Sequence, residues 1–422
     1  MAIKTKIIIA LVLVLILLII IAVPGEQSDG LLGNGNAGGG SGDSAQSVQP
    51  PGDAPPVAVR EWYFVMLTDV TGMSAEEGVA AAWGFDYGVK AINESGGVRG
   101  ISVRSATRDT ASVAVNAAAE MTAVAEGLGV DGGALLVLGP VLSDEYDAAA
   151  QIFTEAHIPA IGHAVGDATL QNYAPYAISS AAEPGGAAGK AVAAWIAGDP
   201  GIQKIAMIYN SSIYSINGNA ERVKEVIAGE GLSLVGTVET GGDTFDAAGV
   251  AETAMGFDAD AYYIDLGGDG NRRVAEQLAH LNGDSAPRLI MGSLNVDLSQ
   301  FLDIAVLSSD KVFFWSEYDP VADGEKRQAF DTAFAAAIGS NHYYNIAVNY
   351  CQAARFAQQA IEELGLTGDP EHLTEERDKL AAYLRDCSLV RTPLGDYETS
   401  AGRKIAQSRL YRMKDGAFVS VP

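Results

Sequence analysis

Strand-like and helix-like segments alternate along most of this chain, and the alternation occurs twice. The segment 134–138 is an unbroken apolar run, as in a parallel strand covered on both faces. In segment 79–93 the apolar residues recur at helical spacing. The same rhythm begins at residue 62 and restarts over 204–291. We therefore predict an α/β fold of two doubly wound, Rossmann-like lobes with parallel sheets.

The length of the chain agrees with this organisation, and its charge limits the partners that it can bind. Its 422 residues exceed what one compact core usually holds, so two lobes are expected. The net charge is −26, from 53 acidic and 27 basic residues. Such a surface repels phosphate backbones, so we predict no nucleic-acid partner.

The N-terminus predicts the compartment. Lys4 and Lys6 precede an unbroken apolar run over 7–23, which as a helix would be roughly 25 Å long. We predict that 1–23 is an uncleaved signal anchor in the cell membrane, with the lysines inside and the rest of the chain outside. A cleaved signal, leaving a secreted or periplasmic protein, is the alternative. Segment 24–58 is rich in Gly, Ser, Asn and Pro and predicts a flexible linker.

No residue pattern indicates catalysis, a metal or a cofactor. The sequence contains no P-loop, nucleophile elbow or HExxH motif, and its five histidines lack ligand spacing. The two cysteines, Cys351 and Cys387, also lack zinc-site spacing. A disulfide between them and two separate buried thiols are both consistent with the sequence. We predict a protein that is not an enzyme.

Polar residues follow the predicted strands, where ligands bind in sheets of this kind. Ser143 follows strand 134–138, and Asp265 lies near the end of strand 261–266. Hydroxyls and helix-start amides suit a ligand carboxylate, whereas an acid suits a ligand ammonium group. For Ser143, helix capping is the alternative interpretation.

The segment 84–109 carries a more specific pattern. It reads Gly-Phe-Asp-Tyr-Gly-Val-Lys-Ala-Ile-Asn-Glu-Ser-Gly-Gly-Val-Arg-Gly, followed by a strand and Arg108-Asp109. This resembles the first helix and turn of the periplasmic leucine/isoleucine/valine-binding proteins, the type I substrate-binding components of ABC importers. The resemblance continues over the following segments: 138–140, 158–161, 315–320, 344–350 and 410–418.

The resemblance implies a type I periplasmic-binding-protein fold, in which a three-strand hinge joins the lobes. Lobe I would comprise 59–180 and 318–400, and lobe II would comprise 181–317 and 401–422. The crossovers would lie near 179–183, 314–320 and 400–405. The implied function is to capture a small polar solute, an amino acid or a related compound, between the lobes and to deliver it to ABC permease subunits. A ligand-sensing receptor ectodomain of the same fold is the alternative.

The resemblance also implies site residues. Ser143 stands where the family has a hydroxyl on the ligand α-carboxylate. Ala164 and Gly166 stand in the loop that supplies a backbone carbonyl and amide. Tyr214 matches the aromatic residue of the second lobe that closes over the ligand.

The chain departs from the family pattern at the ammonium end of the ligand. The family's acid for the amino group aligns with Leu294, and a second-lobe tyrosine aligns with Gly267. Gly166 replaces a usual threonine. Conversely, Glu77 stands at a cleft-facing position that is often aromatic, and Asp265 is a nearby acid. We therefore expect Glu77 and Asp265 to contribute to the ligand site.

Overall fold

The computed structural model describes residues 61–421, except 130–132, 164, 184, 243, 268, 293–306, 318–323, 340–342 and 415–416. The side chains of 214, 215 and 417 are also outside the description. The predicted anchor (1–23) and linker (24–58) lie outside the described residues. Among the helices that are described, none combines the length and the apolar character needed to cross a bilayer.

The first sheet has eight strands in the order β11-β12-β13-β5-β4-β3-β1-β2. The strands β1 to β5 run parallel, while β12 pairs antiparallel with both β11 and β13. Their bounds are β1 Trp62–Thr68, β2 Val103–Asp109, β3 Leu136–Leu138, β4 Ala160–Gly162, β5 Ala177–Ser179, β11 Leu389–Val390, β12 Tyr397–Ser400 and β13 Arg403–Lys404.

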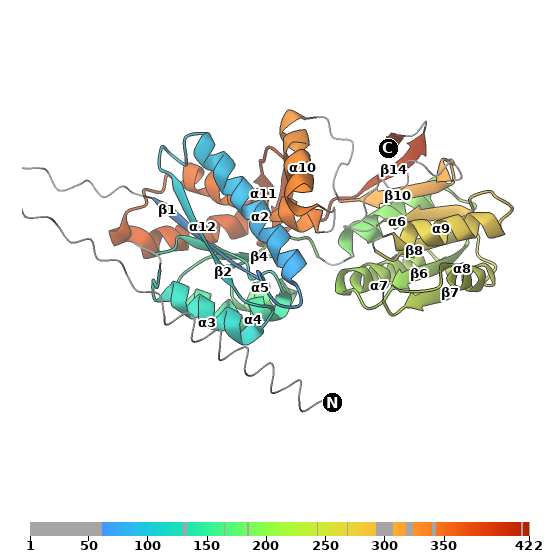
Figure 1. Ribbon diagram of the computed structural model, residues 1–422, viewed down its shortest axis with the longest axis horizontal. Coiled ribbons are helices and arrows are strands. Elements are labelled where there is room, and N and C mark those ends of the chain that lie inside the picture. Colours follow the sequence, from blue (N-terminus) through green and yellow to red (C-terminus); the bar gives the residue numbers. More distant parts are fainter. Residues whose placement is uncertain are drawn as a thin grey trace, which may run out of the picture. The chain divides into compact units, whose positions relative to one another are not determined.

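Helices cover both faces of the first sheet (Figure 1). They are α2 Ala75–Glu94, α3 Ala114–Ala125, α4 Ser143–Glu155, α5 Asp167–Asn172, α11 Tyr344–Leu364 and α12 Leu373–Asp386, with the 3-10 turn η3 Pro370–His372. Alternate β1 side chains enter different cores, because successive strand residues point to opposite faces. Phe64 and Met66 pack with α2, α11 and α12, whereas Val65 and Leu67 pack with α3 and α4. Every residue of β1 is therefore buried.

The second sheet has seven strands in the order β15-β14-β10-β9-β8-β6-β7. The strands β6 to β10 run parallel, and β14 and β15 form an antiparallel hairpin at one edge. Their bounds are β6 Lys204–Asn210, β7 Ser233–Thr240, β8 Ala261–Asp265, β9 Arg288–Met291, β10 Val312–Ser316, β14 Arg409–Lys414 and β15 Ala417–Val421.

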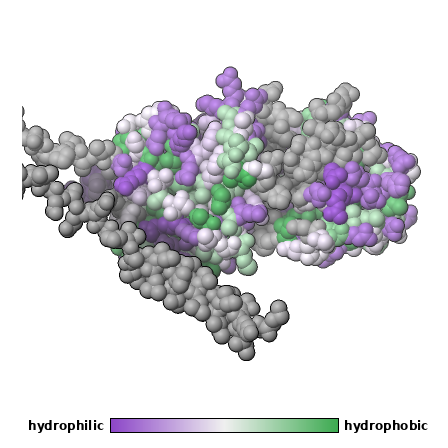
Figure 2. All heavy atoms as spheres, viewed as in Figure 1, coloured by the Kyte–Doolittle hydropathy of each residue, from purple (hydrophilic) through white to green (hydrophobic). Residues whose placement is uncertain are grey.

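The second sheet is also covered on both faces. Its helices are α6 Gly186–Gly198, α7 Tyr214–Gly229, α8 Ala247–Met255 and α9 Gly270–Leu281. Met207 of β6 packs in the core with α6 and α7, whereas its neighbour Ile208 packs in the core with α8 and α9. The outer face of α9 is hydrophilic (Figure 2), as expected of an amphipathic helix on a sheet. The prediction of two α/β lobes is confirmed, but both sheets are mixed rather than wholly parallel as predicted.

The chain passes between the two sheets three times. The first crossing follows β5, the second follows β10, and the third joins β13 to β14. The second crossing leads to α10 Glu325–Ile338, whose Phe330 and Phe334 pack with α2 and α11. Arg403 pairs with Ser179 of the first sheet, so the third crossing begins after β13.

Both cysteines are free thiols in this structure. Cys351 is buried in α11 among the aromatic residues that α10 covers, and burial raises its pKa to about 12. Cys387 is half-buried at the end of α12. Of the two alternatives that the sequence allows, the structure has separate thiols.

Candidate ligand-binding site

Three predicted site residues lie at the carboxyl ends of adjacent strands in the first sheet. Glu77 is in the first turn of α2, which follows β1. Ser143 is the first residue of α4, after β3, and Gly166 directly precedes α5, after β4. Because β4, β3 and β1 are parallel neighbours, their carboxyl ends meet at one edge. The structure therefore brings Glu77, Ser143 and Gly166 to the same edge of the sheet.

Ser143 and Gly166 are exposed at this edge. The N-cap residue of α4 is Leu142, so the capping interpretation does not apply to Ser143. Ser143 holds the first position of α4, and the first amides of a helix have no carbonyl partners within it. Hydroxyl and amide donors at a helix start suit a carboxylate.

Three other residues from the sequence analysis are less fully described. Ala164 and Leu294 lie outside the described residues. Tyr214 is the first residue of α7, at the carboxyl end of β6, and only its backbone is described. Their predicted roles stay predictions.

Asp265 ends β8 and is fully buried inside its lobe. Its Oδ2 accepts hydrogen bonds from Asn219 Nδ2 at 2.9 Å and from the Tyr263 hydroxyl at 3.0 Å. Burial raises its pKa to about 8, although both hydrogen bonds act in the opposite direction. The geometry places Asp265 in an internal polar network of the lobe rather than at an exposed edge.

Beneath the edge that carries Ser143 lies a group of acids, which we call the carboxyl cluster: Asp69, Glu77 and Glu145. Asp69 follows β1 and Glu145 is in the first turn of α4, and both are fully buried. The Thr110 hydroxyl lies 3.0 Å from Asp69 Oδ1 and 3.1 Å from Glu145 Oε2. The Ser112 amide donates to Asp69 Oδ1 at 2.6 Å.

The cluster is electrostatically unusual. Burial, and then the negative charge of Asp69, raise the pKa of Glu77 to about 7. Burial, the charge of Asp69 and a hydrogen bond shared with Asp69 raise the pKa of Glu145 well above its usual range. Groups so perturbed at the edge of a sheet are candidates for function.

The sequence identifies only part of this cluster. Asp69 directly follows a strand, which is a usable signal, but Glu145 reads as an ordinary acid at a helix start. The charges of the same acids raise the pKa of the buried Tyr350 hydroxyl, and Tyr350 belongs to α11, more than two hundred residues further along the chain. No local pattern connects it with the cluster.

A second buried charge lies beside two of the crossings. Lys404 Nζ donates to Asn349 Oδ1 at 2.9 Å and to Gln352 Oε1 at 3.3 Å. Burial lowers its pKa to about 8, and Glu317 at the start of the second crossing acts in the opposite direction. Burial, followed by the Lys404 charge, lowers the pKa of His163 to about 4. The Lys404 ammonium group is thus bound by α11, and its charge also acts on Glu317 and His163.

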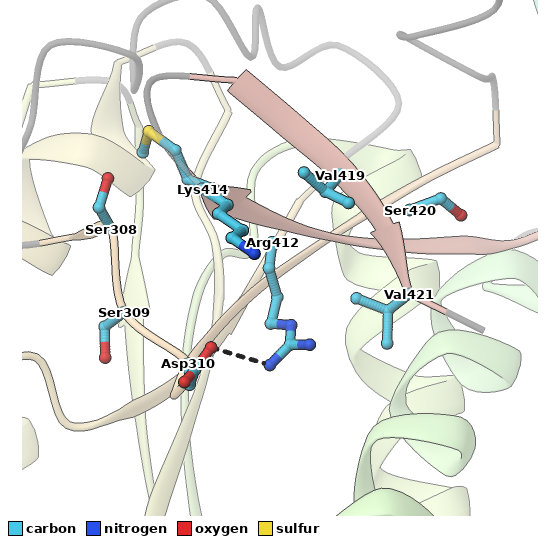
Figure 3. A pocket seen from close by; sticks show the side chains of 9 residues that line it. Ser308, Ser309, Asp310, Arg412, Lys414, Val419, Ser420 and Val421 are labelled. Atoms are coloured by element: carbon cyan, nitrogen blue, oxygen red, sulfur yellow. Dashed lines mark hydrogen bonds and ion pairs between the residues drawn. The ribbon is translucent and has the colours of Figure 1, made fainter.

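A polar recess occurs at the edge hairpin of the second sheet (Figure 3). Arg412 Nη1 donates to Asp310 Oδ1 at 3.1 Å, and Lys414 extends into the same recess. Asp310 precedes β10, so the recess lies at the amino end of that strand. Ligands in such sheets bind at the carboxyl ends, so we do not assign the ligand site here. In the part of the chain that the structure describes, no cluster of His, Cys, Asp or Glu could hold a metal ion.

Comparison with known families agrees with this architecture. The family model described as "Periplasmic binding protein" matches residues 61–417. The chain belongs to the periplasmic binding protein family. Membership in this family makes it a solute-binding protein and not an enzyme, as its sequence predicts. No curated protein matches the chain by sequence.

Solved structures of similar fold include several transporter components. One is the branched-chain amino acid transporter substrate-binding protein LivJ from Streptococcus pneumoniae in complex with isoleucine, at 18% identity and a TM-score of 0.60, covering 86% of this chain and 100% of that one. An ABC transporter substrate-binding protein from Sphaerobacter thermophilus has 17% sequence identity and a TM-score of 0.66, and the match covers 86% of this chain and 96% of that one. A solute-binding protein from R. palustris in complex with benzoate has 18% sequence identity and a TM-score of 0.62, and the match covers 86% of this chain and 95% of that one. These likenesses show the shared fold.

Proposed function

We propose that this chain is the extracytoplasmic substrate-binding component of an ABC importer. It captures a small polar solute, an amino acid or a related compound, between its lobes and delivers it to permease subunits. The observation that carries the proposal is the convergence of Glu77, Ser143 and Gly166 at the carboxyl ends of three adjacent parallel strands.

The ligand carboxylate is the group that this edge suits best. Ser143 offers an exposed hydroxyl beside the amides that begin α4, and Gly166 offers backbone at the start of α5. The ligands named for two relatives, isoleucine and benzoate, share only a carboxylate as a polar group. Ala164 and Tyr214 complete the proposed site from the resemblance, with Tyr214 closing over the ligand from the second lobe.

We also propose that segment 1–23 anchors the protein in the membrane and that 24–58 holds the binding domain away from it. The support is the apolar run behind Lys4 and Lys6 and the polar, glycine-rich composition of the linker. The binding domain then lies outside the cytoplasm, where the solute is captured.

Thermal unfolding in the presence of a ligand panel tests the proposal. The panel contains the amino acids and small carboxylates such as benzoate, each at millimolar concentration. One ligand class should raise the midpoint, because a ligand that binds only the folded state stabilises it. Replacing Ser143 with alanine should remove most of that shift, whereas Ser105→Ala, in the exposed face of β2, should retain it. A panel without any shift contradicts the proposed function.

A further inference from the structure

The carboxyl cluster lacks the donors that its charges require. Thr110 has a single hydroxyl hydrogen but lies within hydrogen-bond distance of both Asp69 and Glu145. Asp69 Oδ2 and Glu145 Oε1 are buried, and they receive no hydrogen from any described residue. Burying carboxylates without compensation is costly, so the pair must hold a proton or face a positive group.

Tyr350 provides an independent observation at the same place. Its side chain is fully buried in α11, and its hydroxyl has no hydrogen-bond partner among the described residues. It packs in one core with Met66 of β1, Ala81 of α2 and Val141 before α4, the elements that carry the three acids. Burial raises the pKa of the Tyr350 hydroxyl, and the charges of Glu77, Asp69 and Glu145 raise it further. The Tyr350 hydroxyl thus comes from α11, which carries none of the three acids, and no described residue forms a hydrogen bond with it.

Glu77 connects the cluster to the exposed edge. It is half-buried, whereas Asp69 and Glu145 are fully enclosed. It stands in the first turn of α2, at the sheet edge where the exposed Ser143 begins α4. Of the three acids, Glu77 is the one that a ligand at this edge can contact.

We propose that Glu77, backed by the buried Asp69–Glu145 pair and Tyr350, is the subsite for a ligand ammonium group. The ligand is then a primary amine that also carries a carboxylate, and lobe I binds both ends of it. This inference rests on the proposed function and deepens it. It also accounts for Leu294 at the position where an acid of the second lobe would bind the amino group.

Ligand binding at this subsite releases protons. Without ligand, the cluster holds protons near neutral pH, because burial and the Asp69 charge raise the pKa of Glu77 to about 7 and raise that of Glu145. Among the described residues, Asp69, Asp144 and Tyr350 are the ionisable groups that interact with these two acids, with the Thr110 hydroxyl beside Glu145. An ammonium group favours the charged carboxylates and therefore displaces protons.

The test is isothermal titration of the full chain with matched ligand pairs. Each pair is an L-amino acid from the panel and the 2-hydroxy acid with the same side chain, so that only the ammonium group differs. We expect the amino acid to bind at least tenfold more tightly. Titrations at pH 7 in two buffers of different ionisation enthalpy should show net proton release on binding of the amino acid only.

Variants assign the effect to Glu77. Glu77→Gln should reduce the preference for the amino acid to less than threefold and abolish most of the proton release. Glu76→Gln changes the exposed neighbouring acid and should leave both unchanged. Equal affinity within the wild-type pair, or an unchanged preference in Glu77→Gln, would overturn the inference while leaving the proposed function intact. Binding of no compound in the panel would overturn the proposed function as well.

Discussion

The side chain of Asn93 forms hydrogen bonds with both the carbonyl and the amide of Val103. Asn93 Nδ2 donates to the Val103 carbonyl at 2.8 Å, and Asn93 Oδ1 accepts from the Val103 amide at 2.8 Å. The end of α2 is thereby fixed to the start of β2. The asparagine of the family-like motif therefore has a structural role here.

Replacing Asn93 should destabilise the first lobe. Asn93→Ala leaves two backbone groups without their partners, so we expect the free energy of unfolding to fall by about 2 kcal/mol. Urea denaturation followed by circular dichroism measures this change. Asn116→Ala in α3, for which no such pair of bonds exists among the described contacts, serves as the control. An unchanged midpoint for Asn93→Ala would contradict the assigned role.

Gly84 allows α2 and α11 to approach closely. A Cβ atom at Gly84 would collide with the backbone carbonyl of Ala347, which cannot move without displacing α11. We expect Gly84→Ala to cost about 3 kcal/mol or more. Gly229→Ala, at the exposed end of α7 where nothing lies near the added atom, should be neutral or slightly stabilising. Thermal denaturation compares the unfolding midpoints of the two variants. Equal midpoints would contradict the close approach of α2 and α11 at Gly84.

Asp265 should make stability depend on pH. Its pKa is raised to about 8 in the folded state from an ordinary value of 3.8, so the folded state holds this proton over the intervening range. The resulting stabilisation is fully present below about pH 4 and is lost as the pH rises through about 8. We expect Asp265→Asn to flatten the profile of unfolding free energy between pH 5 and 8 by roughly 4 kcal/mol. An unaltered profile would show that the Asp265 carboxyl is not buried as described.

Removing residues 1–58 should leave the binding domain unchanged. Both sheets and the helices that cover them lie in the part of the chain that the structure describes, which begins at residue 61. We expect the truncated protein to unfold within about 2 °C of the full chain and to bind the same ligand. The full chain should sediment with membranes and the truncated one should not. If expression of the full sequence instead gives a protein that lacks residues 1–23 and is found only in the soluble fraction, the cleaved-signal alternative is supported.

The sequence predicts the central part of each lobe well, because buried parallel strands are apolar runs. Segment 134–138 has this pattern and contains β3. The two-residue strand β13 has no such pattern, since Arg403 and Lys404 are charged and join the first sheet only through pairing with β5 and β12. For this reason the predicted boundary at residue 401 falls before the last strand of the first sheet.

The candidate site divides in the same way. Ser143 and Gly166 follow predicted strands, so their place at the sheet edge can be predicted from topology. Glu145 joins the carboxyl cluster through the packing of α4, and the packing of α11 brings Tyr350 into the neighbouring core. Long-range packing of this kind leaves no periodic signal in the sequence, and only the fold reveals the cluster.

The account is tested most directly by a crystal structure of the protein with the ligand that the panel identifies. We predict that the ligand carboxylate lies within hydrogen-bond distance of the Ser143 hydroxyl and the first amides of α4. We predict that its ammonium group lies within hydrogen-bond distance of the Glu77 carboxylate. A ligand bound elsewhere, for example in the recess at Arg412 and Asp310, with Ser143 left uncontacted, would contradict the account.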